Sequence, residues 1–134
     1  MAITSAICTS FKQELLVGTH NFTATTGNTF KIALFTSSAT LGASTTAFAT
    51  TNEITNSSGT AYTSGGATLT NITPTTDSTT AVCDFTDVSF TSASFTANGA
   101  LIYNSSASNK AVAVIAFGGD KTVSSGTFTI QFPA

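Results

Sequence analysis

Charge is scarce in this sequence. Only 7% of the 134 residues are charged, against about 25% in a typical soluble domain, and arginine and tryptophan are absent. The four lysines are spread along the chain and the formal net charge is −2, so there is no basic cluster that could neutralise phosphates or hold an anionic membrane surface. We therefore expect neither a nucleic-acid partner nor a membrane partner. A surface with so little charge is poorly protected against association, which favours a protein whose surface is covered by subunit contacts.

Long apolar runs and a cysteine framework are also missing. No run of 18 apolar residues occurs, and the first 18 residues lack a basic start and a long apolar stretch, so we expect neither a transmembrane helix nor a signal peptide. Cys8 and Cys83 lie far apart in the sequence and do not have the spacing that is typical of disulfide-rich domains. They could form a disulfide, but we favour two small buried apolar residues, because a chain of this length can bury a core without a bridge.

Side chains for catalysis are few. His20 could be a general base or a metal ligand, but no partner motif lies near it, which favours a surface or capping residue. Asp84 and Asp87 could bind calcium together with backbone carbonyls, although a spacing of three places them on opposite faces of a strand and favours solvated acids. The segment from Gly118 to Lys121 lacks the spacing of a phosphate-binding loop and is better interpreted as a β-turn. The sequence therefore predicts no enzyme, no cofactor and no metal site.

Threonine and serine take the place of charge and make up about a third of the chain. Threonine is β-branched and suits a pleated surface, so the composition favours sheet over helix. One helix is predicted from Thr4 to Val17, ending at Gly18, because apolar residues recur there every four positions. That stripe consists of Ile3, Ile7, Phe11 and Leu15. It could dock on a neighbouring subunit, but packing on the domain's own sheet is favoured.

Short apolar runs separated by turn residues predict the strands. They cover Thr29–Thr36, Ala67–Ile72 (ended by Thr73-Pro74), Thr80–Phe85 continuing into Val88–Phe90 as one bent strand, Phe95–Tyr103, Lys110–Phe117 and Thr127–Phe132, with a tight turn at Gly118-Gly119-Asp120. In the last strand, Phe128, Ile130 and Phe132 are expected to face inward. The sequence thus predicts a single, mainly β domain over residues 1–134. An N-terminal α-helix (residues 1–18) precedes an antiparallel β-sandwich or jelly-roll-like fold (residues 19–134).

Residues 37–66 form a long stretch with weak periodicity, which we expect to be a loop-rich insertion. A stretch of that length without clear elements is usually functional or ordered by a partner. We therefore predict that this insertion and the N-terminal segment contact other subunits. The candidate interface residues are Ile3, Ile7, Phe11, Leu15, Leu41, Phe48, Ile54 and Tyr62.

Nearly the whole chain also carries a likeness to known sequences. The phrases that carry it are AITSAICTSFKQELLVGTHNF, TFKIALFTSSATLGASTTAF, TNEIT, YTSGGATL, GALIYNSSASNKAVAVIAFGGDKTVSSGTF and the closing TIQFP. In these phrases the sequence resembles a family of small virion proteins of tailed bacteriophages, common in cyanophage and marine phage genomes. The resemblance implies a structural part of the particle, assembled in the bacterial host cytoplasm.

Two places in a virion suit such a chain. The resemblance favours a capsid decoration (cement) protein that binds the major capsid protein on the outer shell and clamps neighbouring subunits, with homotrimers at threefold positions as the natural form. The alternative is a tail or tail-fibre accessory protein that packs on other virion proteins. A carbohydrate-binding adhesion module is a further alternative, for which Tyr62 and Tyr103 are the only tyrosines available.

Overall fold

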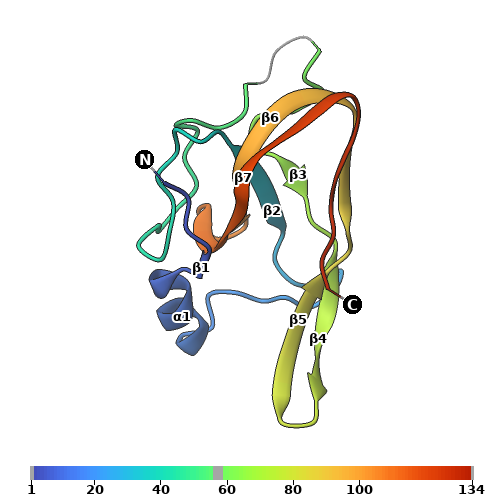
Figure 1. Cartoon of the computed structure of the whole chain (residues 1–134). Helices are drawn as coiled ribbons and strands as arrows, with labels where there is room; N and C mark the ends of the chain where they lie inside the picture. The colour runs from blue at the N-terminus through green and yellow to red at the C-terminus, as the bar shows by residue number, and fades with distance from the viewer. Residues whose placement is uncertain (1, 56–58, 134) are drawn as a thin grey trace.

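The computed structural model describes residues 2–55 and 59–133, and the chain is mainly β with one short N-terminal helix (Figure 1). The elements in chain order are β1 (Ala6–Ile7), α1 (Thr9–Leu16), β2 (Phe30–Phe35), β3 (Ala67–Thr68), β4 (Asn71–Asp77), β5 (Thr80–Phe85), β6 (Val88–Asn104) and β7 (Lys110–Ile130). All pairings between these strands are antiparallel. The predicted fold class, an antiparallel sandwich-like β fold behind one helix, is confirmed.

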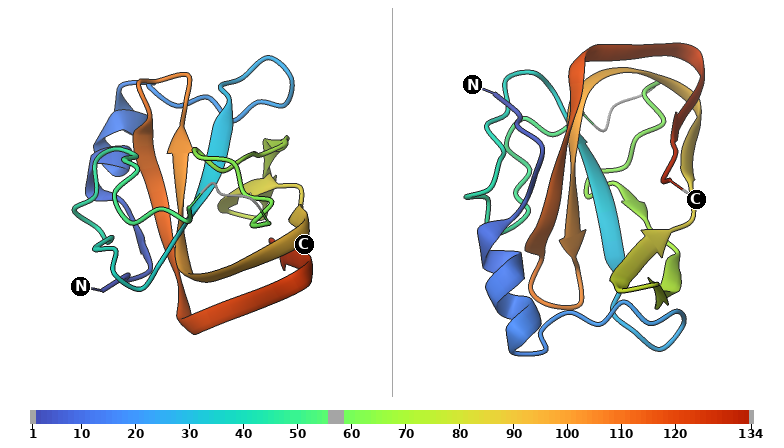
Figure 2. Two further views of the ribbon diagram at one scale, coloured as in Figure 1. Left: turned by 90° about the horizontal axis from the view of Figure 1, so that it is seen from above. Right: turned by 60° about the horizontal axis from the view of Figure 1, so that its bottom comes forward.

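The strands form two sheets of different size. Five strands pair in the order β1-β7-β6-β2-β3, while β4 and β5 form a separate two-stranded ribbon. The long hairpin of β6 and β7 bends over, so that its distal part comes down on the far side of the molecule and gives the sandwich its second layer (Figures 1 and 2). Register shifts between Ala97 and Gly99, and twice more before Phe95, mark the bend, as expected because bulges bend a strand.

Clusters of aromatic side chains fill much of the core. Phe22 stacks on the fully buried Phe30 at a centroid separation of 4.2 Å, and Phe85 lies against both rings. Under the bend, Tyr62 and Phe90 stack with a centroid separation of 5.7 Å. Burial of one such side chain stabilises the fold by about 1.5–3 kcal/mol, so phenylalanine supplies much of the hydrophobic stabilisation.

The helix is shorter than the apolar repeat predicted. α1 begins at Thr9, because Ala6 and Ile7 pair with β7 and Cys8 is still extended, with φ −62° and ψ 136°. Ile3 makes a β-bridge to Leu41, so the four-residue spacing of Ile3 and Ile7 is a coincidence of two extended residues. The predicted helix end is confirmed, since Gly18 follows the helix with φ +76°, the left-handed conformation that glycine adopts readily.

Several details of the predicted strands were wrong. The run predicted as one strand over Ala67–Ile72 is divided between β3 of the five-stranded sheet and β4 of the ribbon. Pro74 does not end a strand but lies within β4, at a register shift of the ribbon, where a missing N–H is tolerated. The predicted bent strand over 80–90 is instead two strands in different sheets. Gly118 and Gly119 have φ +75° and +141° inside β7, where they bend the strand instead of closing a hairpin, because β6 continues as its partner beyond the bend.

The insertion at 37–66 has no strand in its described part, as predicted, and touches the strands through isolated bridges. It is held by Glu53, whose buried carboxylate accepts hydrogen bonds from the Tyr62 hydroxyl at 2.7 Å, the Ser64 hydroxyl at 3.0 Å and the Gly65 amide at 2.6 Å. The Tyr62 hydroxyl also accepts the Leu34 amide of β2 at 3.0 Å. The loop is therefore fixed on the sheet by contacts within the chain.

Candidate functional site

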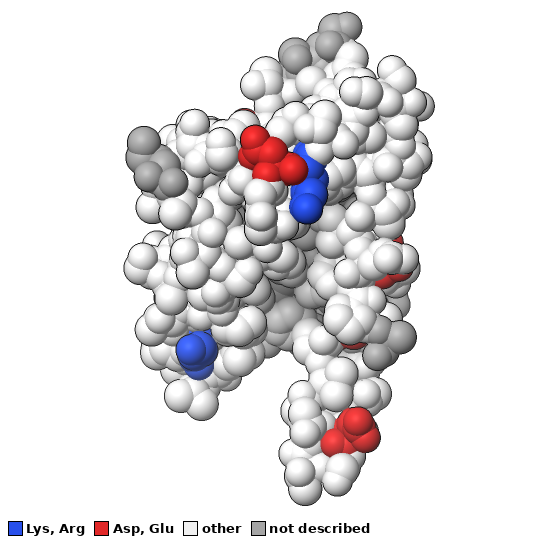
Figure 3. All heavy atoms as spheres, viewed as in Figure 1, with Lys and Arg blue, Asp and Glu red and all other residues white. Residues whose placement is uncertain are grey.

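An apolar groove of about 640 Å³ opens between α1 and the β4–β5 ribbon. Figure 3 shows the hollow between the part of the molecule that holds α1 and the projecting ribbon. Its described lining consists of Ile7, Phe11, Leu15, Phe22, Pro74, Ala81, Val82, Cys83, Asp84, Phe85, Ile102, Val112, Ala113, Ile115, Phe132 and Pro133. Asp84 is the single charged residue in this set. The groove therefore favours an apolar or backbone contact over a charged ligand.

Several large apolar side chains of the groove face solvent. Ile7 is 49% exposed, Leu15 45% and Val82 39%, and they come from β1, α1 and β5. Leu16 and Val17, at the end of α1, are exposed still further. Single exposed apolar residues are ordinary, but a set gathered at one groove is typical of an interaction surface.

Strand β5 presents its edge to the groove. Five consecutive residues, Ala81 to Phe85, line it, although successive side chains of a strand point to opposite faces. β5 pairs with β4 alone among the described strands, so its other edge is unpaired, and the groove borders this strand. In Figure 1, β5 lies on the α1 side of the ribbon and β4 on the far side. β4 contributes only Pro74 to the described lining.

A buried polar network fixes α1 as the opposite wall. The Glu14 carboxylate lies 2.8 Å from the Lys110 ammonium of β7 and 3.2 Å from Nε2 of His20. Burial raises the pKa of Glu14, but hydrogen bonds from Lys110 and His20 and the charge of Lys110 outweigh it, so the net pKa lies below its ordinary value. Asn104 of β6 lies 3.0 Å from Nδ1 of His20 and donates to Asn28 at 2.9 Å. The network therefore ties the helix to the five-stranded sheet.

The hydrogen bonds also define the state of His20. The Asn104 side-chain oxygen accepts the Ser106 amide at 3.0 Å, so its amide nitrogen must face His20 and donate to Nδ1. The proton of the neutral ring is then on Nε2, from which it donates to Glu14. The interpretation of His20 as a surface or capping residue was wrong, because its side chain is fully buried. Both ring nitrogens are engaged, so His20 positions α1.

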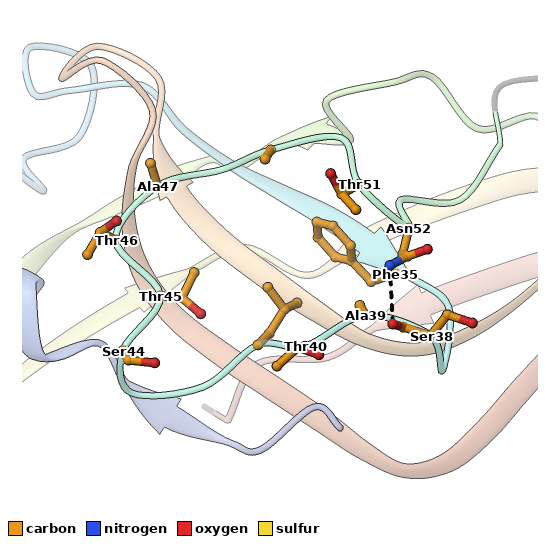
Figure 4. A pocket seen from close by; sticks show the side chains of 12 residues that line it. Phe35, Ser38, Ala39, Thr40, Ser44, Thr45, Thr46, Ala47, Thr51 and Asn52 are labelled. Atoms are coloured by element: carbon orange, nitrogen blue, oxygen red, sulfur yellow. Dashed lines mark hydrogen bonds between the residues drawn. The ribbon is translucent and has the colours of Figure 1, made fainter. Parts of the chain in front are cut away.

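A second hollow of about 540 Å³ lies inside the insertion (Figure 4). Its lining is uncharged and rich in hydroxyls, and the Asn52 amide donates across the loop to the Ser38 carbonyl at 3.1 Å. The ring of Phe35 that closes one side is 1% exposed and offers no stacking face. Tyr62 and Tyr103 are also buried, at 1% and 2% exposure, so neither tyrosine provides a platform for a sugar.

The eight predicted interface residues do not form one surface. They divide into exposed Ile7 and Leu15, half-buried Ile3, Leu41 and Phe48, and buried Phe11, Ile54 and Tyr62. The prediction was wrong for Ile54 and Tyr62, which pack into the core, whereas the buried Phe11 also lines the groove. Ile7 and Leu15 are brought together with Val82 and Phe132, which the sequence interpretation missed. An apolar run in β5 (residues 81–83) was the available signal for Val82.

The other candidate residues serve local structure. The Asp84 carboxylate accepts the Phe85 amide at 2.7 Å, and Asp87 accepts the Phe132 amide at 2.8 Å. No group of three or more metal-ligating side chains occurs in residues 2–55 and 59–133. Both cysteines are free: Cys8 is buried as predicted, and burial raises its pKa, but Cys83 is exposed, which corrects the prediction for that residue.

Comparisons with known proteins do not assign this chain to a family. No protein-family model, no curated protein and no solved structure matches this chain. The described part of the chain also has no helix with the length and apolar character needed to cross a membrane. The function must therefore be argued from the groove, the ribbon and the character of the surface.

Proposed function

We propose that this protein is a non-enzymatic structural subunit of a tailed-bacteriophage virion. Within the particle, we propose, it is a capsid decoration protein that binds the outer shell and clamps neighbouring capsid subunits. The observation that carries the proposal is the β4–β5 ribbon, which stands off the body beside an open apolar groove (Figures 1 and 3). Residues 72–83 of the ribbon are all exposed.

Such a ribbon is suited to being covered by another subunit. An isolated two-stranded hairpin is at best marginally stable in water, so a ribbon with both faces in solvent gains stability from a partner. The exposed Ile7, Leu15 and Val82 beside it would also be removed from water by that partner. These are the properties of an assembly subunit. Apolar surface that is unfavourably exposed to water in the free chain is buried when the interface forms.

The nature of the surface supports a clamp that works through many weak contacts. With 7% charged residues, the available contacts are apolar side chains, hydroxyls and strand edges, none of which is screened by salt. Each contact is small, but copies related by the symmetry of a shell add their contributions. The resemblance of the sequence to small phage virion proteins directs the proposal to the virion.

The buried polar groups support a packing role. Glu14 and His20 hold α1 on the sheet, and Glu53 holds the insertion, so these side chains are engaged in positioning segments of the fold. The adhesion-module alternative is not favoured, because both tyrosines lie in the core.

The copy number in purified virions, measured against the major capsid protein by quantitative mass spectrometry, tests the proposal. A ratio near one to one supports the decoration role. A few to a few tens of copies per particle would overturn it in favour of a tail or tail-fibre accessory protein. Absence from the virion would overturn the structural role altogether.

A further inference from the structure

We propose that the groove is filled by a second copy of this chain, whose β5 pairs antiparallel with β5 across a two-fold axis. The two ribbons then join into one four-stranded sheet in the order β4-β5-β5-β4. This inference goes beyond the proposed function, because it names a second copy of this chain as the subunit that covers the ribbon and the groove, and it is tested on the isolated chain.

The first support is the open edge of β5. Its edge runs along the groove, and no proline or lysine occurs between Thr80 and Phe85. An exposed strand edge with apolar side chains is a template for another strand, because its outer N–H and C=O groups need partners. The groove lies directly beside this edge, so an added strand would enter it.

Several other described edges are protected by the usual devices. The outermost strands of the five-stranded sheet, β1 and β3, are two residues long. β4 contains Pro74, and the distal part of β7 begins with the charged pair Asp120 and Lys121. β5 contains neither proline nor lysine, and its open edge faces an apolar groove.

Charge is distributed between the ribbon and the body in a complementary way. Residues 71–87 contain Asp77, Asp84 and Asp87 and no lysine, whereas all four lysines lie outside this segment. Antiparallel pairing would turn the neighbour's ribbon around, so that its tip with Asp77 enters the groove beside α1, which carries the exposed Lys12. Figure 3 shows acidic atoms near the end of the ribbon and basic atoms across the hollow, over α1. This charge complementarity favours a second copy of the chain as the partner that occupies the groove.

The symmetry limits the register. In an antiparallel pair about a two-fold axis, one residue faces its own copy. An axis at Asp84 would place two carboxylates opposite each other, which is destabilising, whereas an axis at Val82 or Cys83 avoids this. In either of these registers the partner covers the exposed Val82, Ile7 and Leu15. The threefold association expected from the resemblance is a separate contact and stays a prediction.

Disulfide cross-linking of the purified full-length chain tests the pairing. The test set is the unchanged protein, which has Cys83, and Val82→Cys in a Cys83→Ser background. The matched control is Thr75→Cys in the same background, because Thr75 is exposed and lies opposite Val82 on the far strand of the ribbon. Partial desolvation by its neighbours and the charge of Asp84 raise the pKa of the exposed Cys83, so oxidation is run at roughly pH 9, where more thiolate is present. Cys8 is buried and common to all three proteins.

The expected result is a covalent dimer at position 82 or 83, with about tenfold less at position 75, because a disulfide requires Cα atoms within roughly 7 Å. Equal cross-linking at 75 would refute the pairing. A second variant, Val82→Lys, should convert the dimer to a monomer in analytical ultracentrifugation with an unchanged circular dichroism spectrum, since Val82 is exposed in the single chain. A monomeric unchanged protein, or a Val82→Lys protein that remains dimeric, would overturn the inference and leave the virion proposal standing.

Discussion

Removing the hydroxyl of Tyr62 should destabilise the fold more than removing the hydroxyl of the other tyrosine. The Tyr62 hydroxyl donates to the Glu53 carboxylate at 2.7 Å and accepts the amide of Leu34 at 3.0 Å. Tyr62 is 1% exposed, so water cannot replace either bond in Tyr62→Phe. The ring remains, which keeps its packing on Phe90 and leaves no large cavity.

The magnitude follows from the groups left without partners. The variant leaves the buried Leu34 amide unsatisfied and removes one of three hydrogen bonds from the buried Glu53 carboxylate. An unsatisfied buried donor costs about 1–3 kcal/mol, and a hydrogen bond to a charged group contributes about 1.5–3 kcal/mol. These effects overlap, so we expect a loss of about 2–3 kcal/mol in the free energy of unfolding.

Tyr103→Phe is the matched control. Its hydroxyl makes one hydrogen bond, to the carbonyl of Gly65 at 2.6 Å, and its ring is equally buried. Loss of a single neutral bond should cost about 1 kcal/mol. Urea denaturation followed by circular dichroism measures both, and the Tyr62→Phe midpoint should fall by about 1 M if the slope is about 2 kcal/mol/M. A Tyr62→Phe loss no larger than that of Tyr103→Phe would refute the assignment of Tyr62 as the anchor of the insertion.

Three further predictions concern pH and backbone shape. Burial and the Glu53 carboxylate raise the pKa of Tyr103 from 10.0 to about 12, so the folded chain holds a proton that the unfolded chain releases. Stability should therefore fall as the pH rises from 10.0 towards 12, and ultraviolet titration should show tyrosine ionising together with unfolding. The lowered pKa of Glu14 contributes stability above its ordinary value of 4.5 that is lost as the pH falls through the folded value, so acid denaturation of Glu14→Gln should depend less on pH. Gly66→Ala should destabilise far more than Gly118→Ala in thermal melts. Both glycines have positive φ, but a Cβ at Gly66 would overlap the Ile32 carbonyl, whereas one at Gly118 meets nothing within 4 Å. Equal losses would show that backbone conformation alone decides the cost.

The sequence predicts strands well where one face is buried. Phe128 and Ile130 alternate with exposed threonines as expected, because the distal part of β7 packs one face on the core. β2 was predicted within one residue at each end, since the run of apolar residues from Phe30 to Phe35 is bounded by polar residues. Local patterning is sufficient in these segments because the pattern and the burial have the same period.

The N-terminal segment shows where periodicity is ambiguous. The four-residue spacing from Ile3 to Leu15 fits a helix, but this local pattern cannot predict that Ala6 and Ile7 pair with β7. That pairing joins residues more than 100 positions apart, and a long-range pairing overrides a local preference. The same reason explains Gly118 and Gly119. Their sequence predicts a turn, but they lie in a bent strand because β6 is long enough to pair with β7 on both sides of the bend.

The groove could not be found from the sequence, because its walls are brought together by the fold. Ile7, Leu15, Val82 and Phe132 come from β1, α1, β5 and the segment after β7. Each of these residues is unremarkable in its own segment. The polar network that places α1 is equally non-local, since it joins Glu14 to Lys110 and His20 to Asn104.

The scarcity of charge and the open edge of β5 have to be explained together. A free monomer with 7% charged residues has little electrostatic protection against non-specific association. An open strand edge adds to this tendency, because it can pair with a strand of another molecule. Pro74 protects the edge of β4, and Asp120 and Lys121 protect the bend of β7, whereas β5 has neither a proline nor a lysine. An edge that is left open beside exposed Leu15 and Val82 is stable in solution if a symmetric partner closes it. A two-fold pair has no further free β5 edge, so the same contact that buries the edge also stops growth.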